Sequence, residues 1–377
     1  MKSVSEKPNA VGTIIDYVNT MNEGFRERPF CEVDSLVLSQ FSYLRFNGFV
    51  PTPSHPEESI SIRELVAMDH LSWLFLDVRD QKSNLKLLLA LCESPRFADV
   101  RLCRYVDQID RSLEKQFSAL TFLIDREMAY VAFRGTDSTF VGWKEDFNMA
   151  FMDSVPAQLE GVRYLDDLID DGRNLLVGGH SKGGNVAVYA AMFCSPSVER
   201  RIIRVYSHDG PGFSDAIFHH ERYAQIRHKI CKTLPHSSLI GMLLQQQEVF
   251  KVVKSNRFWI MQHDPFSWLV EGDDFCYVRT IASNAEYFNK VLNSWVSSLE
   301  PSQRALFIDS LYEVIQSTQA TTFRDLLDNK REKAIAAAFA IRDIDEETRR
   351  FILKTLSSLF VVLVEELDWR KGPTVRR

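Results

Sequence analysis

Short apolar runs alternate with segments of helical spacing through the middle of the chain. The runs at 120–124 and 128–133 are rich in β-forming residues and flank the polar turn 125–127, which predicts a β-hairpin. Downstream, the pattern predicts strands at 175–177, 202–206, 249–253 and 275–278, and helices at 157–169, 183–193 and 214–230. This alternation predicts an α/β fold, with a mostly parallel sheet and helices on both of its faces.

Helical patterns precede this central region. Residues 10–46 predict helix, with Asp34 as the cap of a helix whose apolar positions follow it. Residues 49–58 hold three prolines and must form a loop, and helical spacing returns at 59–75 and 85–91. Two alternatives stay open for the proline-rich loop and the helix after it: a lid over an apolar cleft, or a plain surface excursion.

Helical patterns also follow the central region. They cover 285–299, 302–317, 322–342 and 345–367, and the last is amphipathic. We expect these stripes to pack within the chain or in a homodimer rather than on a membrane. The predicted organisation is an N-terminal helical extension with a candidate lid (1–118), an α/β core (119–283) and a C-terminal helical subdomain (284–377).

Composition narrows the function classes. The chain has 377 residues, a net charge of −6 and no stripe of Lys and Arg, which makes nucleic acid an unlikely partner class. No leader-like apolar run follows the N-terminus, no run is apolar enough to span a bilayer, and the six cysteines form no CxxC pair. These features predict a cytoplasmic protein with reduced thiols. No zinc-spaced cluster, Walker A loop or GxGxxG occurs, so we expect no metal and no cofactor.

The most informative segment is Gly179-His180-Ser181-Lys182-Gly183, a G-x-S-x-G between an apolar strand and an alanine-rich helix. In this motif the serine stands on a sharp strand-to-helix turn, and the crowded backbone requires glycine on both sides. The backbone N–H of Lys182 then points at the substrate oxygen near a helix N-terminus, which favours developing negative charge. The Lys182 side chain has two alternative roles: to meet an anionic substrate group at the pocket mouth, or to extend into solvent.

A second segment, 129–147, ends a strand in Phe133-Arg134-Gly135-Thr136-Asp137 and continues to Trp143 and Asp146. Together with the GHSKGG phrase, this segment resembles the class 3 lipases of the α/β-hydrolase superfamily. The phrases DGPGF and QHDPFSW resemble a bacterial branch of that superfamily. The resemblance covers about 120–270 and implies hydrolase chemistry, with Thr136 contributing to the oxyanion hole. Arg134 and Asp137 fit a salt bridge in the turn at least as well as a catalytic role.

A serine nucleophile needs a base, and the base needs an orienting acid. Two of the nine histidines directly precede an aspartate at a predicted strand end, in His208-Asp209 and His263-Asp264. Neighbours in extended chain point to opposite sides, so each histidine should pair with the other aspartate. The Ser…Asp…His order of this fold favours Ser181–Asp209–His263, with Asp264 and His208 as the alternates. The class 3 resemblance instead favours Asp264 as the acid, but no histidine follows His263 to complete that pattern.

These features predict a lipase- or esterase-like serine hydrolase. It would cleave a small-molecule carboxylic ester or a lipid through an acyl-enzyme on Ser181, with backbone N–H groups of Lys182 and Thr136 holding the oxyanion. Two alternatives stay open: a thioester or amide hydrolase, and a catalytically silent hydrolase-fold protein that binds a partner or ligand. An ordered triad would favour the enzyme, and a serine without a histidine in reach would favour the binder.

Overall fold

The computed structural model describes residues 11–110, 112, 115–136, 149, 154–243 and 249–283, and a few single positions beyond them: 285–287, 290, 293, 346, 349 and 350. The predicted C-terminal helices, the subdomain that they would form and a homodimer through them therefore fall outside the described residues. So do Asp137, Trp143 and Asp146.

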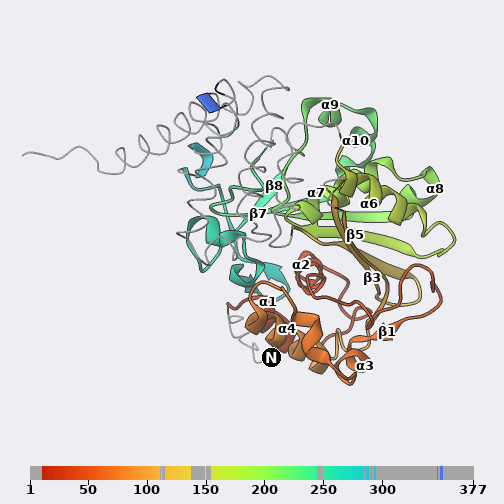
Figure 1. Cartoon of the computed structure of the whole chain (residues 1–377). Helices are drawn as coiled ribbons and strands as arrows, with labels where there is room; N and C mark the ends of the chain where they lie inside the picture. The colour runs from red at the N-terminus through yellow and green to blue at the C-terminus, as the bar shows by residue number, and fades with distance from the viewer. Residues whose placement is uncertain are drawn as a thin grey trace, which may run out of the picture.

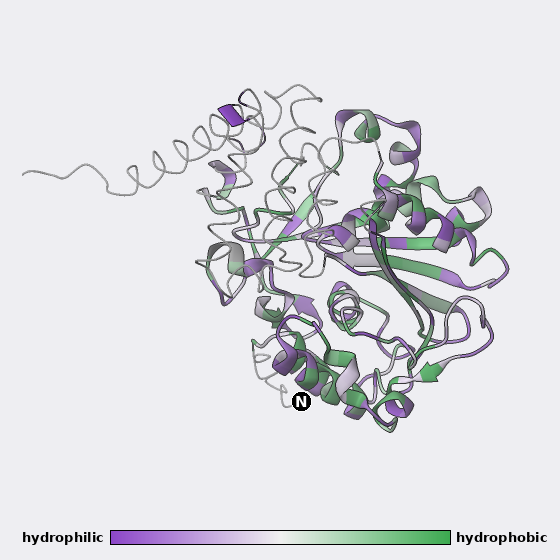
Figure 2. Cartoon of the chain, viewed as in Figure 1, coloured by the Kyte–Doolittle hydropathy of each residue, from purple (hydrophilic) through white to green (hydrophobic). Residues whose placement is uncertain are grey.

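A nine-stranded mixed sheet organises the described chain, in the order β1-β2-β3-β4-β5-β6-β7-β8-β11 (Figure 1). Its strands are β1 (Ile60–Ser61), β2 (Arg101–Asp110), β3 (Lys115–Leu123), β4 (Met128–Phe133), β5 (Asn174–His180), β6 (Ile202–His208), β7 (Ile230–Pro235), β8 (Phe250–Val253) and β11 (Tyr277–Val278). Strands β4 to β8 pair in parallel, and the strands outside them pair antiparallel. A small second sheet pairs β9 (Val270–Glu271) with β10 (Asp274–Phe275). The predicted α/β fold with a parallel core is confirmed, and the central strands are largely hydrophobic in Figure 2.

The sheet begins earlier in the chain than the sequence predicts. The predicted hairpin is present as β3 and β4, which are antiparallel and joined by a turn at 124–127. A further strand, β2, lies antiparallel to β3 on its other side, within the region expected to be helical extension. Strand β2 carries charged residues and an irregularity between Cys103 and Val106, where Arg104 has a φ of 56°. Both features interrupt the two-residue alternation by which a strand is recognised.

Helices cover both faces of the sheet. One face, which includes Phe122 and Tyr130, packs on α1 (Ile14–Thr20), α2 (Glu32–Phe41) and α4 (Gln81–Glu93). The other face, which includes Val131 and Val177, packs on α6 (Pro156–Asp166), α7 (Lys182–Phe193), α8 (Pro196–Glu199) and α10 (Glu221–Ile226). The N-terminal helices thus form one layer of the same three-layer structure, because the apolar sheet face beneath them needs a cover.

Several predicted helices are shorter than the pattern suggests. Residues 10–46 form α1 and α2 with an irregular segment between them, and 59–75 divide into β1, α3 (Ile62–Val66) and the 3₁₀ helix η1 (Leu71–Phe75). Residues 214–230 divide into α9 (Asp215–Phe218), α10 and the 3₁₀ helix η2 (Arg227–Lys229), and β7, which the sequence analysis did not predict, follows. Residues 49–58 are irregular, as their prolines require.

Asp34 does not have the predicted cap position. Cys31 is the N-cap of α2, and Asp34 lies three residues later, where its carboxylate accepts a hydrogen bond from the Cys31 N–H at 2.8 Å. The same carboxylate forms a buried ion pair with Arg96 at 2.6 Å and accepts from the Tyr17 hydroxyl at 2.7 Å. The Arg96 guanidinium also donates to the carbonyls of Glu23, Arg28 and Pro29. Asp34 and Arg96 therefore hold the segment between α1 and α2 against the fold.

Candidate active site

The strand-to-helix turn between β5 and α7 places Ser181 at the carboxyl end of the parallel strands. Ser181 has φ 58° and ψ −133°, a backbone conformation that non-glycine residues rarely adopt. Its N–H donates to the carbonyl of His208 on the neighbouring strand at 2.9 Å, so the turn is fixed to the sheet. The serine side chain therefore stands at the N-terminus of a twelve-residue helix, as the motif predicts.

The two glycines that flank the turn allow its backbone to pack against β4. A Cβ on Gly183 would lie 2.0 Å from the carbonyl oxygen of Phe133, and a Cβ on Gly179 would lie 2.5 Å from the same oxygen. No side chain fits at either distance. The sharp turn at Ser181 thus depends on both glycines of the G-x-S-x-G pattern.

The structure brings Ser181, His263 and Asp209 together in one hydrogen-bonded line. The Oγ atom of Ser181 lies 3.0 Å from Nε2 of His263, and Nδ1 of the same ring lies 2.6 Å from Oδ2 of Asp209. His263 ends the 3₁₀ helix η3 (Trp259–His263), in the loop that follows β8. Asp209 follows β6 directly and has a positive φ of 49°, which turns its side chain out of the strand.

Asp209 is fully buried, and several donors surround its carboxylate. Oδ1 accepts from the Ser238 hydroxyl at 2.5 Å and from the Gly241 N–H at 3.1 Å, and Oδ2 accepts from His263. An ionised carboxylate accepts all three bonds, and charge-assisted bonds of this kind offset the cost of burying the charge. With Asp209 as the acceptor, Nδ1 of His263 carries its proton and Nε2 is free to accept from Ser181.

The alternate pair, Asp264 with His208, lies elsewhere. His208 is buried on the opposite side of its strand, where Nε2 lies 2.9 Å from the Ser35 hydroxyl of α2 and Nδ1 lies 2.7 Å from Thr233 Oγ1. Burial lowers the pKa of His208 to about 3, so this ring is neutral. Asp264 forms an ion pair with Arg257 and accepts from the Phe266 N–H. The side chains of His208 and Asp264 thus face these other partners, because adjacent residues of an extended chain face opposite sides.

His180 points into the fold, as expected for the residue before the nucleophile. Its ring lies against the ring of His263, with a centroid distance of 4.5 Å. Nε2 of His180 lies 2.8 Å from the backbone carbonyl oxygen of His263, and Nδ1 lies 3.0 Å from the hydroxyl of Tyr43. Burial, together with the nearby His263, holds the pKa of His180 well below its usual value.

The structure supports neither of the two roles considered for the Lys182 side chain. Lys182 is 1% exposed, and its Nζ donates to the backbone carbonyl and to Oε1 of Gln116, both at 2.7 Å. The ammonium group therefore ties the start of α7 to β3 inside the protein. The backbone N–H of Lys182 remains at the helix N-terminus, next to Ser181.

The segment after β4 lies beside the turn. A Cβ on Gly135 would lie 3.1 Å from the Cβ of Ser181, so the residues of this segment are close neighbours of the serine. Thr136 follows Gly135 and is partly exposed. Arg134 forms a buried ion pair with Asp107 at 2.7 Å, which agrees with a structural role for the arginine and gives it a partner other than Asp137. Asp107 also binds Arg45 at 2.9 Å.

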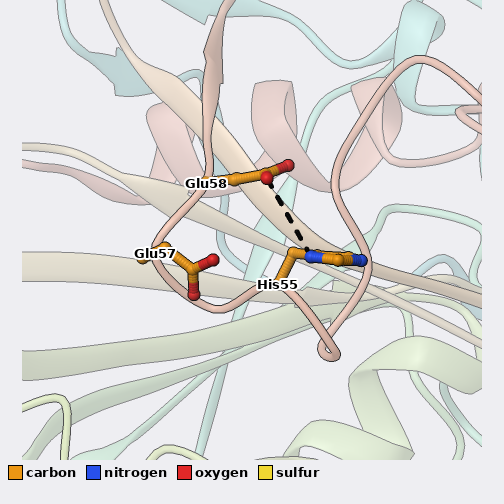
Figure 3. A group of neighbouring side chains, drawn as sticks. All are labelled: His55, Glu57 and Glu58. Carbon is orange, nitrogen blue, oxygen red and sulfur yellow. Dashed lines mark ion pairs between the residues drawn. The ribbon is translucent and has the colours of Figure 1, made fainter.

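A separate polar group lies far from this site. The side chains of His55, Glu57 and Glu58 come together on the proline-rich loop, with Nδ1 of His55 3.9 Å from Oε1 of Glu58 (Figure 3). All three are exposed. Together these atoms have the chemistry of a weak surface cation site, but side chains this exposed are also common without an ion.

The same loop lines a groove of about 350 Å³. Its walls are Pro56, Glu57, Glu58, Cys103, Arg104, Leu123, Asp170, Asp171 and Arg173. These residues lie near the starts of β2, β4 and β5, and Ser181 lies at the opposite end of β5. The loop therefore lines a polar groove, because β1 attaches the chain after the loop to the start of β2. The lid considered above, formed by this loop and the helix after it, stays a prediction.

Sequence reasoning missed four residues of the site: Tyr43, Ser238, Gly241 and Gln262. The first three contact the triad or His180, and Gln262 holds the neighbouring loops together by accepting from the Ser237 N–H at 2.7 Å. Gln262 is the first residue of the QHDPFSW phrase, directly before His263, and this position offered a signal. The other three residues lie in none of the motifs described above.

The chain is similar, at low sequence identity, to two solved lipase structures. The chain is similar to the crystal structure of M37 lipase, with 14% identity and a TM-score of 0.36 over 56% of this chain and 70% of that one. It is also similar to the native propeptide complex of Rhizomucor miehei lipase, with 15% identity and a TM-score of 0.37 over 67% of this chain and 73% of that one.

A comparison with curated proteins gives no match. Across the described residues, no helix has the length and apolar character needed to cross a bilayer. A family model for Mbeg1-like proteins matches residues 91–313, which is more than half of the chain and includes Ser181, Asp209 and His263. The chain belongs to the Mbeg1-like family.

Proposed function

We propose that this protein is a serine hydrolase that cleaves carboxylic esters through an acyl-enzyme on Ser181. The observation that carries the proposal is the continuous line of hydrogen bonds from Ser181 through His263 to Asp209, with lengths of 3.0 and 2.6 Å. A nucleophile, a base within reach and a group that orients the base are the parts that acyl transfer requires. The strained backbone at Ser181 supports the proposal further, because such strain persists where the surrounding structure enforces it.

In the first half of the reaction, Ser181 Oγ attacks the substrate carbonyl carbon while Nε2 of His263 takes the hydroxyl proton. Asp209 stabilises the imidazolium that forms, and its bonds from Ser238 and Gly241 keep the carboxylate in place. His263 then gives the proton to the departing alkoxide, and the alcohol leaves. In the second half, water donates a proton to His263 and attacks the acyl-enzyme. His263 then returns the proton to Ser181 Oγ as the carbon–oxygen bond to the serine breaks, which releases the acid and restores Ser181.

The oxyanion of each tetrahedral intermediate would be held by the backbone N–H groups of Lys182 and Thr136. The N–H of Lys182 is in the first turn of α7, where the helix dipole favours negative charge. The buried bonds of the Lys182 side chain to Gln116 would keep this donor fixed before substrate arrives. Preorganised donors of this kind are among the largest contributions to acyl transfer.

An apolar acyl group suits the surface beside the base. Phe258 is 87% exposed and Met261 is 50% exposed, and both lie within five residues of His263 in the same loop. Two exposed apolar side chains in the loop that carries the base favour an ester with a hydrocarbon part, and a lipid ester belongs to that class.

The test combines covalent labelling with a substrate series. A fluorophosphonate probe reacts quickly only with a base-activated serine, so it should label the wild-type protein and fail to label Ser181→Ala. Ser197→Ala is the matched control, since Ser197 belongs to the short helix α8 and its hydroxyl contacts Ser195. Turnover of p-nitrophenyl esters with acyl chains of graded length, and of matched thioesters and anilides, then identifies the bond cleaved.

Equal labelling of the wild type and Ser181→Ala would overturn the proposal. Faster turnover of the thioester or anilide series would replace the ester with that class and leave the triad in place. A correctly folded wild-type protein that neither labels nor turns over any substrate would favour the catalytically silent binding protein.

A further inference from the structure

We propose that Tyr43 and His180 form a positioning relay that holds the backbone of His263 where its ring can reach Ser181. This inference rests on the proposed hydrolase function and adds two residues to its site. One comes from the segment just after α2, outside the 91–313 region that the family model matches. The other is the residue directly before the nucleophile.

His180 contacts His263 in two ways. The rings pack at a centroid distance of 4.5 Å and an interplanar angle of 38°, and Nε2 of His180 lies 2.8 Å from the His263 carbonyl oxygen. The ring contact holds the orientation of the His263 ring, and the hydrogen bond to the carbonyl holds the backbone of His263. Because His180 belongs to the end of β5, it transmits the position of the sheet to the loop that carries the base.

The pattern of partners sets the protonation of His180. A backbone carbonyl only accepts, so the Nε2 atom that faces it carries the ring proton. Burial keeps the pKa of His180 well below its usual value, so the ring is neutral and its Nδ1 has no proton. Nδ1 therefore accepts from the Tyr43 hydroxyl at 3.0 Å. The direction of donation runs from Tyr43 to His180 to the carbonyl of His263.

The hydroxyl of Tyr43 sits close to three parts of the site: the His180 ring, Gly135, and the His180 carbonyl oxygen, which lies 3.5 Å from the hydroxyl. It lies 3.0 Å from the His180 ring, and a Cβ built on Gly135 would lie only 2.1 Å from it. The same Cβ would lie 2.6 Å from the His180 carbonyl oxygen. The hydroxyl thus occupies the space between the segment after β4 and the turn at Ser181, and glycine at position 135 makes room for it. A tyrosine so placed acts on the reaction through its neighbours.

Three variants separate the steps of the relay. Tyr43→Phe removes only the hydroxyl, His180→Gln keeps a donor near the Nε2 position, and His180→Phe keeps a ring but has no donor. Loss of one hydrogen bond should lower kcat by about 3- to 10-fold in Tyr43→Phe. A misplaced base should lower kcat by about 100-fold in His180→Phe. His180→Gln should recover most of that loss, with KM near the wild-type value in all three, because none of these side chains is proposed to hold the substrate.

A double variant tests whether the two residues act in series. If Tyr43 works only through His180, adding Tyr43→Phe to His180→Phe should reduce kcat no further. Two independent structural contributions would instead multiply. Tyr164→Phe is the matched control: its hydroxyl is buried and bonds to Thr121 of β3 and to the Arg104 carbonyl of β2, two strands that carry no residue of the triad. It should keep wild-type kcat.

The outcomes are separable from those of the hydrolase proposal. The relay is refuted if Tyr43→Phe and His180→Gln both keep the wild-type kcat and His180→Phe loses less than about 3-fold in kcat. If the wild type still labels with fluorophosphonate in that case, the hydrolase proposal stands. Multiplying losses in the double variant would refute the serial order. A wild type that never labels overturns the hydrolase itself. Should His180→Phe fail to fold, as its melting curve would show, Tyr43→Phe and His180→Gln still decide the question.

Discussion

Replacing Asp209 by asparagine isolates the charge at the end of the triad. The hydroxyl of Ser238 and the N–H of Gly241 both donate to Oδ1, so an amide oxygen must take that position. The amide nitrogen then faces Nδ1 of His263, where Oδ2 is now 2.6 Å away. Two donors cannot face each other, so His263 must move its proton to Nε2. That proton would point at Ser181, and the ring could no longer act as a base.

The expected loss in kcat for Asp209→Asn is about 10⁴-fold, which corresponds to about 5.5 kcal/mol of lost transition-state stabilisation. Asparagine tolerates the positive φ at this position, so the fold should persist. The assay is p-nitrophenyl ester turnover at pH 7, with a melting curve on each protein. Asp264→Asn is the matched control, since that carboxylate pairs with Arg257, and it should cost less than about 10-fold. Equal losses in the two variants, or a larger loss in Asp264→Asn, would refute the assignment of Asp209.

Three further outcomes are expected. The pKa of His208 in the folded protein, about 3, is below the unfolded value, so its contribution to stability is complete above about pH 6.5 and is lost as pH falls toward 3. Between these pH values, the free energy of unfolding measured in urea should change by up to about 1.4 kcal/mol per pH unit. His208→Gln should reduce that slope. Ser181→Gly should abolish turnover yet stabilise the protein by about 1 kcal/mol in the same unfolding assay, because glycine adopts φ 58° without strain. Phe258→Ser should raise KM for long acyl esters several-fold more than for acetate if this exposed side chain meets the acyl group, and equal KM changes across the series would remove it from the substrate surface.

The sequence predicted those parts of the site that depend on local chain geometry. The turn at Ser181 follows from its glycines, and the approach of His263 and Asp209 follows from two His-Asp pairs whose members face opposite ways. Tyr43 was not predictable, because it is separated from His180 by 137 positions and only the packed fold brings them together. The burial of Lys182 was also missed, because no residue near Lys182 in the sequence indicates that Gln116, 66 positions away, is its partner.

The same distinction holds for the fold. The parallel strands around the nucleophile are nearly continuous apolar runs, as expected where both faces are covered, and they were recognisable. Strand β2 carries Arg101, Arg104, Asp107 and Asp110, and its irregularity disrupts the period, so it was missed. Strand β7 ends in Pro235, a residue that usually argues against a strand.

Helix α2 is attached to the sheet by polar as well as apolar contacts. Its serines bond to buried partners: Ser35 to Nε2 of His208 and to the Tyr130 hydroxyl, and Ser39 to the same hydroxyl at 2.7 Å. A slip of the helix by one turn would leave these buried groups without partners, so the network specifies a single docking register. The region matched by the family model begins at residue 91, after α2 and most of α4. That region alone would expose an apolar sheet face and orphaned polar groups. The boundary of sequence similarity therefore cuts through one packed layer of the fold, and a truncated chain that keeps this layer should begin before α1.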